Sequence, residues 1–407
     1  MKSIRLRQGR ERSLLKRHPW VFQGSVDRGR ADAGETVRVE DAAGRFLGWG
    51  AYSGASQIAV RVWSFDEAER IDAAFFRRRI DAAIALRSRL PIASNAMRLV
   101  HAEADGLPGL IVDRYDQTLC AQFGSAGVER FKDVIADASL AASGCTRLYE
   151  RSDAASRKLE GLDPAVGWLR GPVDGLTDTG TTASTIVPTT VTIEEHGWQL
   201  TLDVAQGHKT GYYLDQRDNR ALFAQWVRQS GARRVLNAYC YTGGFTVAAL
   251  AGGAEQVLSV DSSAPALLRV QQHVQLNGFD IARSECRDAD VNAVLREQLQ
   301  ASQRFDAIVL DPPKFAPTAA HAERAARAYK DINRLALMLL APGGLLFTFS
   351  CSGGISADLF HKIVAGAGID AGVDAAVVAR VGAAPDHPQT LWFPEGEYLK
   401  GLLLLRR

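Results

Sequence analysis

The sequence lacks several features that would assign it at once to a class of protein. Its 407 residues include only five cysteines, which are scattered and never form a C-x-x-C pair, so we expect neither a disulfide framework nor a structural zinc site. The longest aliphatic run, residues 402–405, is far shorter than the roughly 20 apolar residues of a membrane-spanning helix. The basic N-terminus has no apolar leader. We therefore expect a soluble, cytoplasmic protein with no metal and no membrane partner.

Positive charge is concentrated at the N-terminus, although the formal net charge is only +2. Residues 1–30 contain nine lysines and arginines but only two acids. Clustered cations bind phosphates, whereas a solvated basic surface explains the same pattern equally well. Nearby aromatic rings offer stacking surfaces, which favours RNA. The candidate RNA-binding residues are Arg5, Arg7, Arg10, Arg12, Lys16, Arg17, His18 and Trp20.

The pattern of apolar residues predicts three domains. Residues 1–75 are small and mostly β, and residues 76–196 mix strands with helices, beginning with a helix over 75–90 and ending with a turn-rich segment at 171–185. Residues 197–407 alternate apolar strands with helices, which is typical of a doubly wound α/β fold with a mostly parallel sheet. In this last part we expect strands at 233–239, 256–261, 306–311, 344–351 and 398–406, and a helix capped by Ser262 or Ser263 and followed by Gly278.

Ligands of such folds bind at the carboxyl ends of the strands. The first expected strand runs into a helix through Thr242-Gly243-Gly244, where the backbone can pass close to a ligand. The second ends at Asp261, where an acid can bind both hydroxyls of a ribose. The turn lacks the G-x-G-x-x-G spacing of dinucleotide sites, so S-adenosylmethionine is favoured over NAD. Asp288 ends the next expected strand and is interpreted either as an adenine contact or as a surface acid.

Two further strand ends carry candidate catalytic residues. The motif Asp311-Pro312-Pro313-Lys314-Phe315 follows a buried strand, and its prolines make a stiff exit that fixes Asp311 beside a bound base. Cys351 ends the strand at 344–351. Its position fits a nucleophile and a buried core cysteine equally well.

Together these residues resemble the bacterial 23S ribosomal RNA (cytosine-C5) methyltransferases of the RlmI type. The matching stretches run along nearly the whole chain and include GRERSLLKRHPWVFQGSV, ADGLPGLIVDRY, GHKTGYYLDQRDNR, YTGGF, DPPKF, YKDINRLA, FTFSCSG and PEGEYLKG. The resemblance implies a PUA RNA-binding domain over 1–75, a central α+β domain over 76–196 and a Rossmann-like class I methyltransferase domain over 197–407. It implies S-adenosylmethionine as cofactor, ribosomal RNA as substrate and, more weakly, a homodimer.

By motif matching, the resemblance also implies roles for individual residues. The cofactor would be surrounded by Gln216, Arg217, Asn237, Tyr241, Thr242, Gly243, Gly244, Asp261, Asp288 and Asp311. The Cys351 thiolate would attack C6 of cytosine so that C5 accepts the methyl group and then loses its proton, with Asp311 stabilising charge near N3. Lys314 stands where related enzymes have a second cysteine, so the group that removes the C5 proton stays open. The alternatives are methylation of a guanine nitrogen, which needs no thiol, and a non-catalytic RNA-binding assembly factor.

Overall fold

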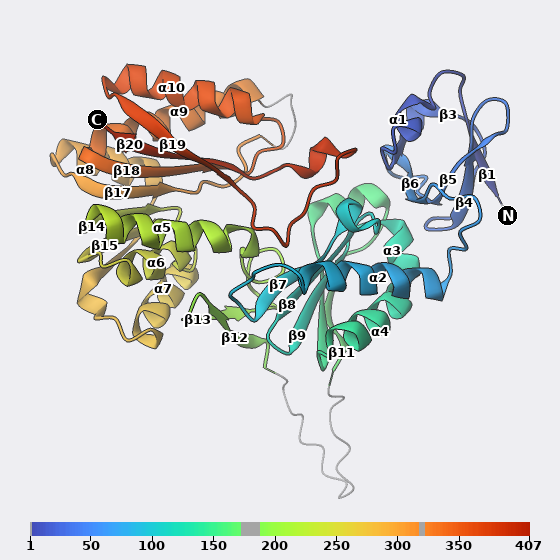
Figure 1. Cartoon of the computed structure of the whole chain (residues 1–407), viewed down its shortest axis with the longest axis horizontal. Coiled ribbons are helices and arrows are strands. Elements are labelled where there is room, and N and C mark those ends of the chain that lie inside the picture. Colours follow the sequence, from blue (N-terminus) through green and yellow to red (C-terminus); the bar gives the residue numbers. More distant parts are fainter. Residues whose placement is uncertain (1, 172–187, 317–321) are drawn as a thin grey trace, which may run out of the picture. The chain divides into compact units, whose positions relative to one another are not determined.

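The computed structural model describes residues 2–171, 188–316 and 322–407. The chain divides into two compact units (Figure 1). The first unit comprises Met1–Glu194, Leu202–Leu214 and Pro385–Gly396, and the second comprises Glu195–Thr201, Asp215–Ala384 and Glu397–Arg407. The predicted turn-rich segment at 171–185 lies, after its first residue, outside the described residues.

The first unit begins with a six-stranded sheet in the order β2-β6-β5-β4-β1-β3. Its strands are β1 Ser3–Leu6, β2 Trp20–Phe22, β3 Val26–Arg28, β4 Thr36–Glu40, β5 Phe46–Tyr52 and β6 Ile58–Ser64, and the short helix α1 spans Arg12–Leu15. Alternate residues such as Val37 and Val39 point into one small core, which they share with Val60 and Val62. The predicted β-rich N-terminal part is confirmed.

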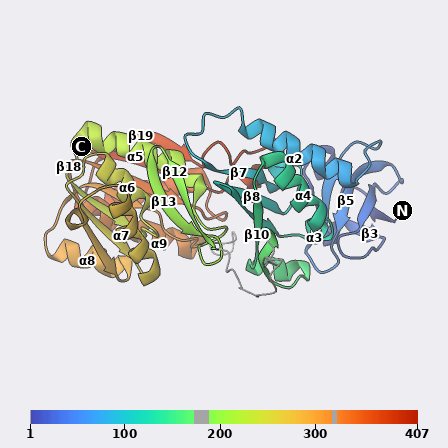
Figure 2. The same ribbon diagram turned by 90° about the horizontal axis from the view of Figure 1, so that it is seen from below.

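A second, five-stranded sheet of the first unit has the order β11-β10-β9-β8-β7. Its strands are β7 Ala96–His101, β8 Leu110–Tyr115, β9 Thr118–Phe123, β10 Arg147–Ser152 and β11 Ala165–Arg170, and its helices are α2 Ala73–Arg87, α3 Ala126–Arg130 and α4 Lys132–Ser143. Helix α2 begins where the Asp72 carboxylate accepts a hydrogen bond from the Phe75 amide. It packs beside α4 (Figure 2).

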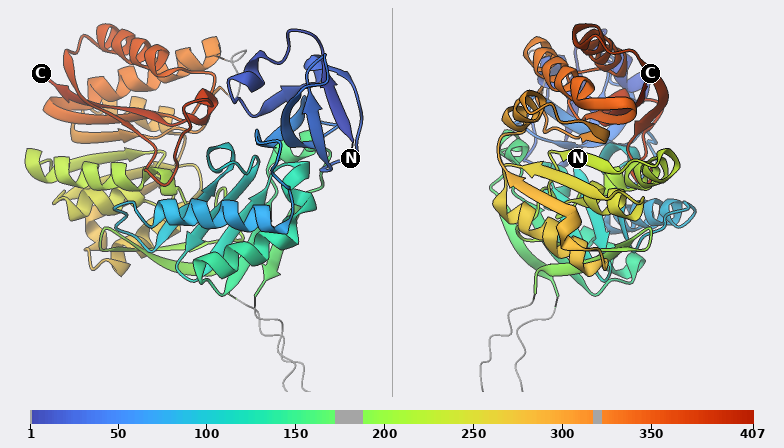
Figure 3. Two further views of the ribbon diagram at one scale, coloured as in Figure 1. Left: turned by 45° about the vertical axis from the view of Figure 1, so that its right-hand side comes forward. Right: turned by 90° about the vertical axis from the view of Figure 1, so that its left-hand side faces the viewer.

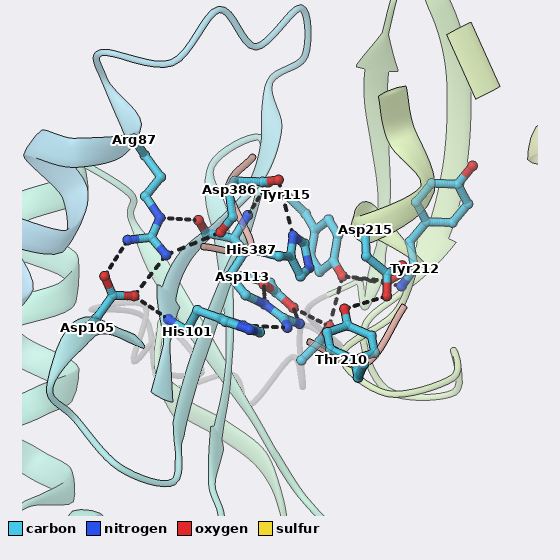
Figure 4. Close-up of polar contacts among 12 residues, drawn as sticks. Arg87, His101, Asp105, Asp113, Tyr115, Thr210, Tyr212, Asp215, Asp386 and His387 are labelled. Atoms are coloured by element: carbon cyan, nitrogen blue, oxygen red, sulfur yellow. Dashed lines mark hydrogen bonds and ion pairs between the residues drawn. The ribbon is translucent and has the colours of Figure 1, made fainter. Parts of the chain in front are cut away.

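Buried polar contacts attach two later segments of the chain to this second sheet (Figure 4). Arg87 makes two hydrogen bonds to the Asp105 carboxylate, at 2.5 and 2.8 Å, and donates to the Asp386 carbonyl at 3.2 Å. The Thr210 hydroxyl donates to the Asp113 carboxylate at 2.6 Å. Removing one partner of a buried ion pair typically costs about 3–5 kcal/mol. These contacts therefore fix the returning segments firmly within the first unit.

A hairpin of β12 (Thr190–Glu195) and β13 (Trp198–Asp203) leads into the second unit, which is built on a seven-stranded sheet. The sheet has the order β16-β15-β14-β17-β18-β20-β19, and only β20 runs antiparallel to its neighbours. Its strands are β14 Arg234–Ala238, β15 Gln256–Asp261, β16 Ser284–Asp288, β17 Phe305–Leu310, β18 Leu340–Ser350, β19 Ala375–Gly382 and β20 Lys400–Arg406. The predicted doubly wound, mostly parallel sheet is confirmed.

Helices cover both faces of this sheet (Figure 3). Helices α5 Arg217–Ser230, α6 Gly244–Ala251 and α7 Ala264–Leu276 enclose one core, and α8 Val291–Gln300, α9 Ala322–Leu339 and α10 Ala357–Ala371 enclose the other. Helix α7 begins as predicted, because the Ser263 hydroxyl accepts from the Ala266 amide, and Gly278 follows its end with a left-handed φ of 72°. Among the described residues no helix is long and apolar enough to cross a membrane.

Candidate active site

The carboxyl ends of five neighbouring strands bring the candidate residues to one edge of the sheet. Asp261 ends β15 and lies opposite Asp288, the last residue of β16. Asp311 follows β17 directly, and Cys351 follows β18 directly. Strand order reverses between β14 and β17, whose ends are neighbours at Ala238 and Leu310. Ligands of doubly wound sheets bind at such a reversal.

The loop after β14 has an unusual backbone. Tyr239, Tyr241 and Gly243 all have left-handed φ values, of 61°, 47° and 80°. A Cβ atom added to Gly243 would lie 2.8 Å from the Cγ1 atom of Val270. Gly243 caps α6, and Gly244 is the first residue of that helix. Residues other than glycine adopt this conformation at a cost, and such strain gathers at binding sites.

Asp261 holds this loop and still has capacity for a ligand. One carboxylate oxygen accepts from the Tyr241 amide at 2.9 Å, and the other accepts from the Ser263 amide at 3.0 Å. Each ionised oxygen can accept a further hydrogen bond, as from the hydroxyls of a ribose. The buried Thr242 hydroxyl has no partner among the described residues, whereas Asp288 is exposed. The loop, the acid and the unpartnered hydroxyl therefore fit an adenosine-containing cofactor.

His273 positions the same loop, and the sequence gave no reason to single it out. Its Nδ1 lies 2.7 Å from the Thr242 carbonyl oxygen, and its Nε2 accepts from the Thr201 amide at 2.9 Å. Burial lowers the pKa of His273, so the ring is neutral at physiological pH. It appears in the sequence as one polar residue among the apolar positions of α7. Its role depends on partners that are distant in the chain.

Asp311 is the end of a chain of buried amides. The Gln216 side chain donates to the Asp311 carboxylate at 2.9 Å and accepts from the Asn219 amide at 2.6 Å. Asn219 also donates to the Gly382 carbonyl at 2.9 Å. Gln216, for which we predict a cofactor contact, therefore orients the acid that begins the DPPKF motif.

Two other predicted cofactor residues are largely enclosed by protein. Arg217 is completely buried, and its Nε donates to the Asp218 carboxylate at 3.1 Å. Asn237 is buried in β14 and donates to the Thr246 hydroxyl at 2.9 Å, which attaches α6 to the sheet. These contacts give both residues a structural role at the edge of the site.

The loops after β17 and β18 are attached to each other beside Cys351. The Cys351 thiol is partly exposed and lies 3.9 Å from the Pro312 carbonyl oxygen. The Ser352 hydroxyl accepts from the Ala316 amide at 3.1 Å and lies 3.0 Å from the Tyr329 hydroxyl. The sulfur is therefore held next to the DPPKF motif instead of being enclosed in the core.

Lys400 is a second residue of the site that sequence reasoning missed. Its buried ammonium group donates to the carbonyls of Ser352, at 2.9 Å, and Ile355, at 2.6 Å. Burial lowers its pKa, and the nearby Cys351 opposes this shift. Lys400 therefore holds the turn after Cys351 and places a cation close to the sulfur. Lys314, in contrast, is exposed.

The predicted RNA-binding residues of the first unit fall into two groups. Arg7, Arg10, Arg12, Lys16 and Arg17 are exposed, whereas Arg5, His18 and Trp20 are half-buried. Arg5 pairs with Glu40 at 3.0 Å, and the Trp20 indole donates to Glu103 at 2.8 Å. The five exposed cations are the ones placed to reach phosphates from this surface.

Comparison with known families defines the class of protein. Residues 4–65 match a PUA-like domain, and residues 182–393 match the S-adenosylmethionine-dependent methyltransferases. The crystal structure of SMU.776 complexed with SAH aligns over 100% of both chains with a TM-score of 0.84 at 20% identity, and a Streptococcus mutans structure assigned to the SAM-dependent methyltransferases aligns equally completely with 0.82 at 19%. The protein is thus a methyltransferase that uses S-adenosylmethionine, with a PUA-like domain at its N-terminus.

Two relatives define the family more closely. The ribosomal RNA large subunit methyltransferase I of Alteromonas mediterranea is 46% identical over 98% of this chain and 97% of its own length. The protein of the same name from Citrobacter koseri is 46% identical over 97% of each chain. The chain belongs to the ribosomal RNA large subunit methyltransferase I family. In the described part of the chain, no group of three or more His, Cys, Asp or Glu side chains could hold a metal ion.

Proposed function

We propose that this enzyme methylates carbon 5 of a cytosine in large-subunit ribosomal RNA, with Cys351 as the nucleophile. The observation that carries this proposal is the position of the Cys351 sulfur, which is partly exposed and 3.9 Å from the Pro312 carbonyl oxygen. Methylation of a guanine nitrogen would need no thiol at this place. The family relationship supports ribosomal RNA as the substrate and, with it, a cytoplasmic location.

The bound cofactor supplies an electrophilic methyl group, and the chain's own residues prepare the base. The Cys351 thiolate adds to C6 of cytosine, and the electron pair of the C5–C6 double bond makes C5 nucleophilic. After C5 has accepted the methyl group, loss of the C5 proton restores the double bond and breaks the S–C6 bond. Lys400 provides positive charge that favours the thiolate. Asp311, oriented by Gln216, stabilises the charge that develops around N3.

Three residues of the loop after β14 support cofactor binding in this proposal. Asp261 would accept hydrogen bonds from the ribose hydroxyls, and Thr242 would meet a polar group of the cofactor with its unpartnered hydroxyl. Gly243 lets the backbone approach closely. We also propose that the exposed cations of residues 1–30 bind RNA phosphates, within a PUA domain over 1–75 that precedes a central domain over 76–196.

Trapping the covalent adduct tests the proposal. The enzyme is incubated with labelled cofactor and ribosomal RNA in which cytidine is replaced by 5-fluorocytidine, whose fluorine cannot leave as a proton. We expect a complex that survives denaturing electrophoresis with the wild-type enzyme and none with Cys351→Ala. Cys240→Ala, which removes a buried thiol of the same unit, is the matched control. Methylation of a guanine nitrogen that survives Cys351→Ala would refute the cytosine assignment.

A further inference from the structure

A cavity of about 700 Å³ lies within the first unit, away from the residues discussed so far. Its lining comes from both sheets of that unit, with Phe22 from β2, Arg61 from β6 and Gln122 from β9. Arg151 of β10 and the turn around Leu159 complete it. Cavities of roughly 300–1,000 Å³ with apolar walls and a few polar groups are typical of sites for small organic groups.

The mouth of the cavity presents apolar side chains to solvent. Leu159 is 69% exposed and Phe22 is 47% exposed. Ile58 and Ile111 continue this apolar wall. An exposed aromatic ring beside an aliphatic side chain offers two faces between which a flat ring can stack.

The polar residues of the cavity offer hydrogen-bond donors that the described chain does not use. Arg61 donates from Nη2 to Glu160 at 2.7 Å, but its Nε and Nη1 have no acceptor among the described residues. Arg151 donates from Nη1 to two backbone carbonyls, at 2.8 and 2.9 Å, and its Nε likewise has no acceptor there. A buried donor without an acceptor costs about 1–3 kcal/mol. A ligand with an acceptor edge would recover part of that cost.

We propose that this cavity receives one unpaired base of the ribosomal RNA substrate, a subsite that rests on the proposed function. Proteins read RNA mainly through unstacked bases, whose faces stack on aromatic rings and whose edges bind Arg and Gln. The base lies against Phe22 and Leu159, with its oxygen and nitrogen acceptors toward Arg61 and Arg151. The Gln122 amide provides both a donor and an acceptor for the same edge. The phosphates remain outside, where the exposed cations of the N-terminal sheet can meet them.

The full-length enzyme and a fluorescent single-stranded RNA oligonucleotide test the subsite. Phe22→Ala and Leu159→Ala alter exposed side chains, so both variants should fold, and thermal unfolding checks this. Each should weaken binding roughly tenfold, the usual effect of losing one base-stacking contact. Leu268→Ala, which truncates a leucine of α7 that is 62% exposed, is the matched control. An oligonucleotide that carries 4-thiouridine should crosslink to a peptide containing Phe22 or Leu159.

The outcomes separate this inference from the proposed function. With the unmodified ribosomal RNA substrate, the two cavity variants should raise KM for RNA about tenfold and leave kcat and cofactor affinity unchanged. If the wild type methylates cytosine while both variants bind RNA as tightly as Leu268→Ala and no crosslink maps to the cavity, the subsite is wrong and the proposed function stands. If the variants lose RNA binding but the methyl group is found on a guanine nitrogen, the subsite stands and the cytosine assignment is wrong.

Discussion

Replacing Asp261 with asparagine tests the cofactor site most directly, because the change keeps the shape of the side chain and removes its charge. The carboxylate now accepts from two backbone amides, at 2.9 Å from Tyr241 and 3.0 Å from Ser263. Asparagine has only one acceptor oxygen, so its NH₂ group must face one of these two donors. The substitution therefore loosens the loop after β14 and also removes a charged acceptor for the ribose.

The size of the effect follows from these hydrogen bonds. A hydrogen bond to a charged group contributes about 1.5–3 kcal/mol. Losing one such bond to the ribose should weaken S-adenosylhomocysteine binding between about tenfold and 150-fold, since about 1.4 kcal/mol corresponds to a factor of ten. Losing the bond to the loop should lower the free energy of unfolding by about 1–3 kcal/mol.

Calorimetric titration with S-adenosylhomocysteine measures the affinity, and ligand-dependent thermal unfolding measures it independently. Asp290→Asn is the matched control, because Asp290 caps α8 by accepting from the Ala293 amide at 2.8 Å and asparagine caps equally well. It removes one negative charge near the same edge of the sheet. A folded Asp261→Asn enzyme that binds the ligand within twofold of Asp290→Asn would show that Asp261 does not bind the cofactor.

Three further perturbations test the surroundings of the site. Gly243→Ala should cost on the order of 2 kcal/mol in chemical denaturation, because alanine is strained at a φ of 80° and its Cβ would meet Val270 at 2.8 Å; an unchanged denaturation midpoint would contradict this. His273 has a lowered pKa, so the unfolded chain binds the proton more readily and stability should fall as pH drops below about 6.5, by at most about 1.4 kcal/mol per pH unit; unfolding of His273→Gln against pH should lack that component, and an identical slope would reject it. Lys400→Met should slow alkylation of Cys351 by iodoacetamide at neutral pH by roughly tenfold, the equivalent of one charge-assisted hydrogen bond, and should lower kcat without changing cofactor affinity; unchanged alkylation would exclude an effect of Lys400 on the sulfur.

The sequence by itself determined the features that depend on neighbouring residues. Helix α7 begins at Ser263 and ends before Gly278 because capping and left-handed glycines act within a few residues. Strands β14, β15, β17, β18 and β20 lie where apolar runs predicted them. The order of strands and helices was enough to predict that Asp261, Asp311 and Cys351 follow strands of one sheet, because doubly wound folds place such ends together.

Only the tertiary structure decided which distant side chains meet. Strand β19 was not predicted, since its residues are only partly buried and its pairing with β20 completes the strand. The predicted helix over 128–142 is divided at Phe131 into α3 and α4. His273 with Thr242, Gln216 with Asp311, and Lys400 beside Cys351 are pairs separated by 31, 95 and 49 positions. Local sequence patterns extend over one or two turns of a helix, whereas the contacts that orient the nucleophile, the acid and the cofactor loop arise only when the sheet has formed.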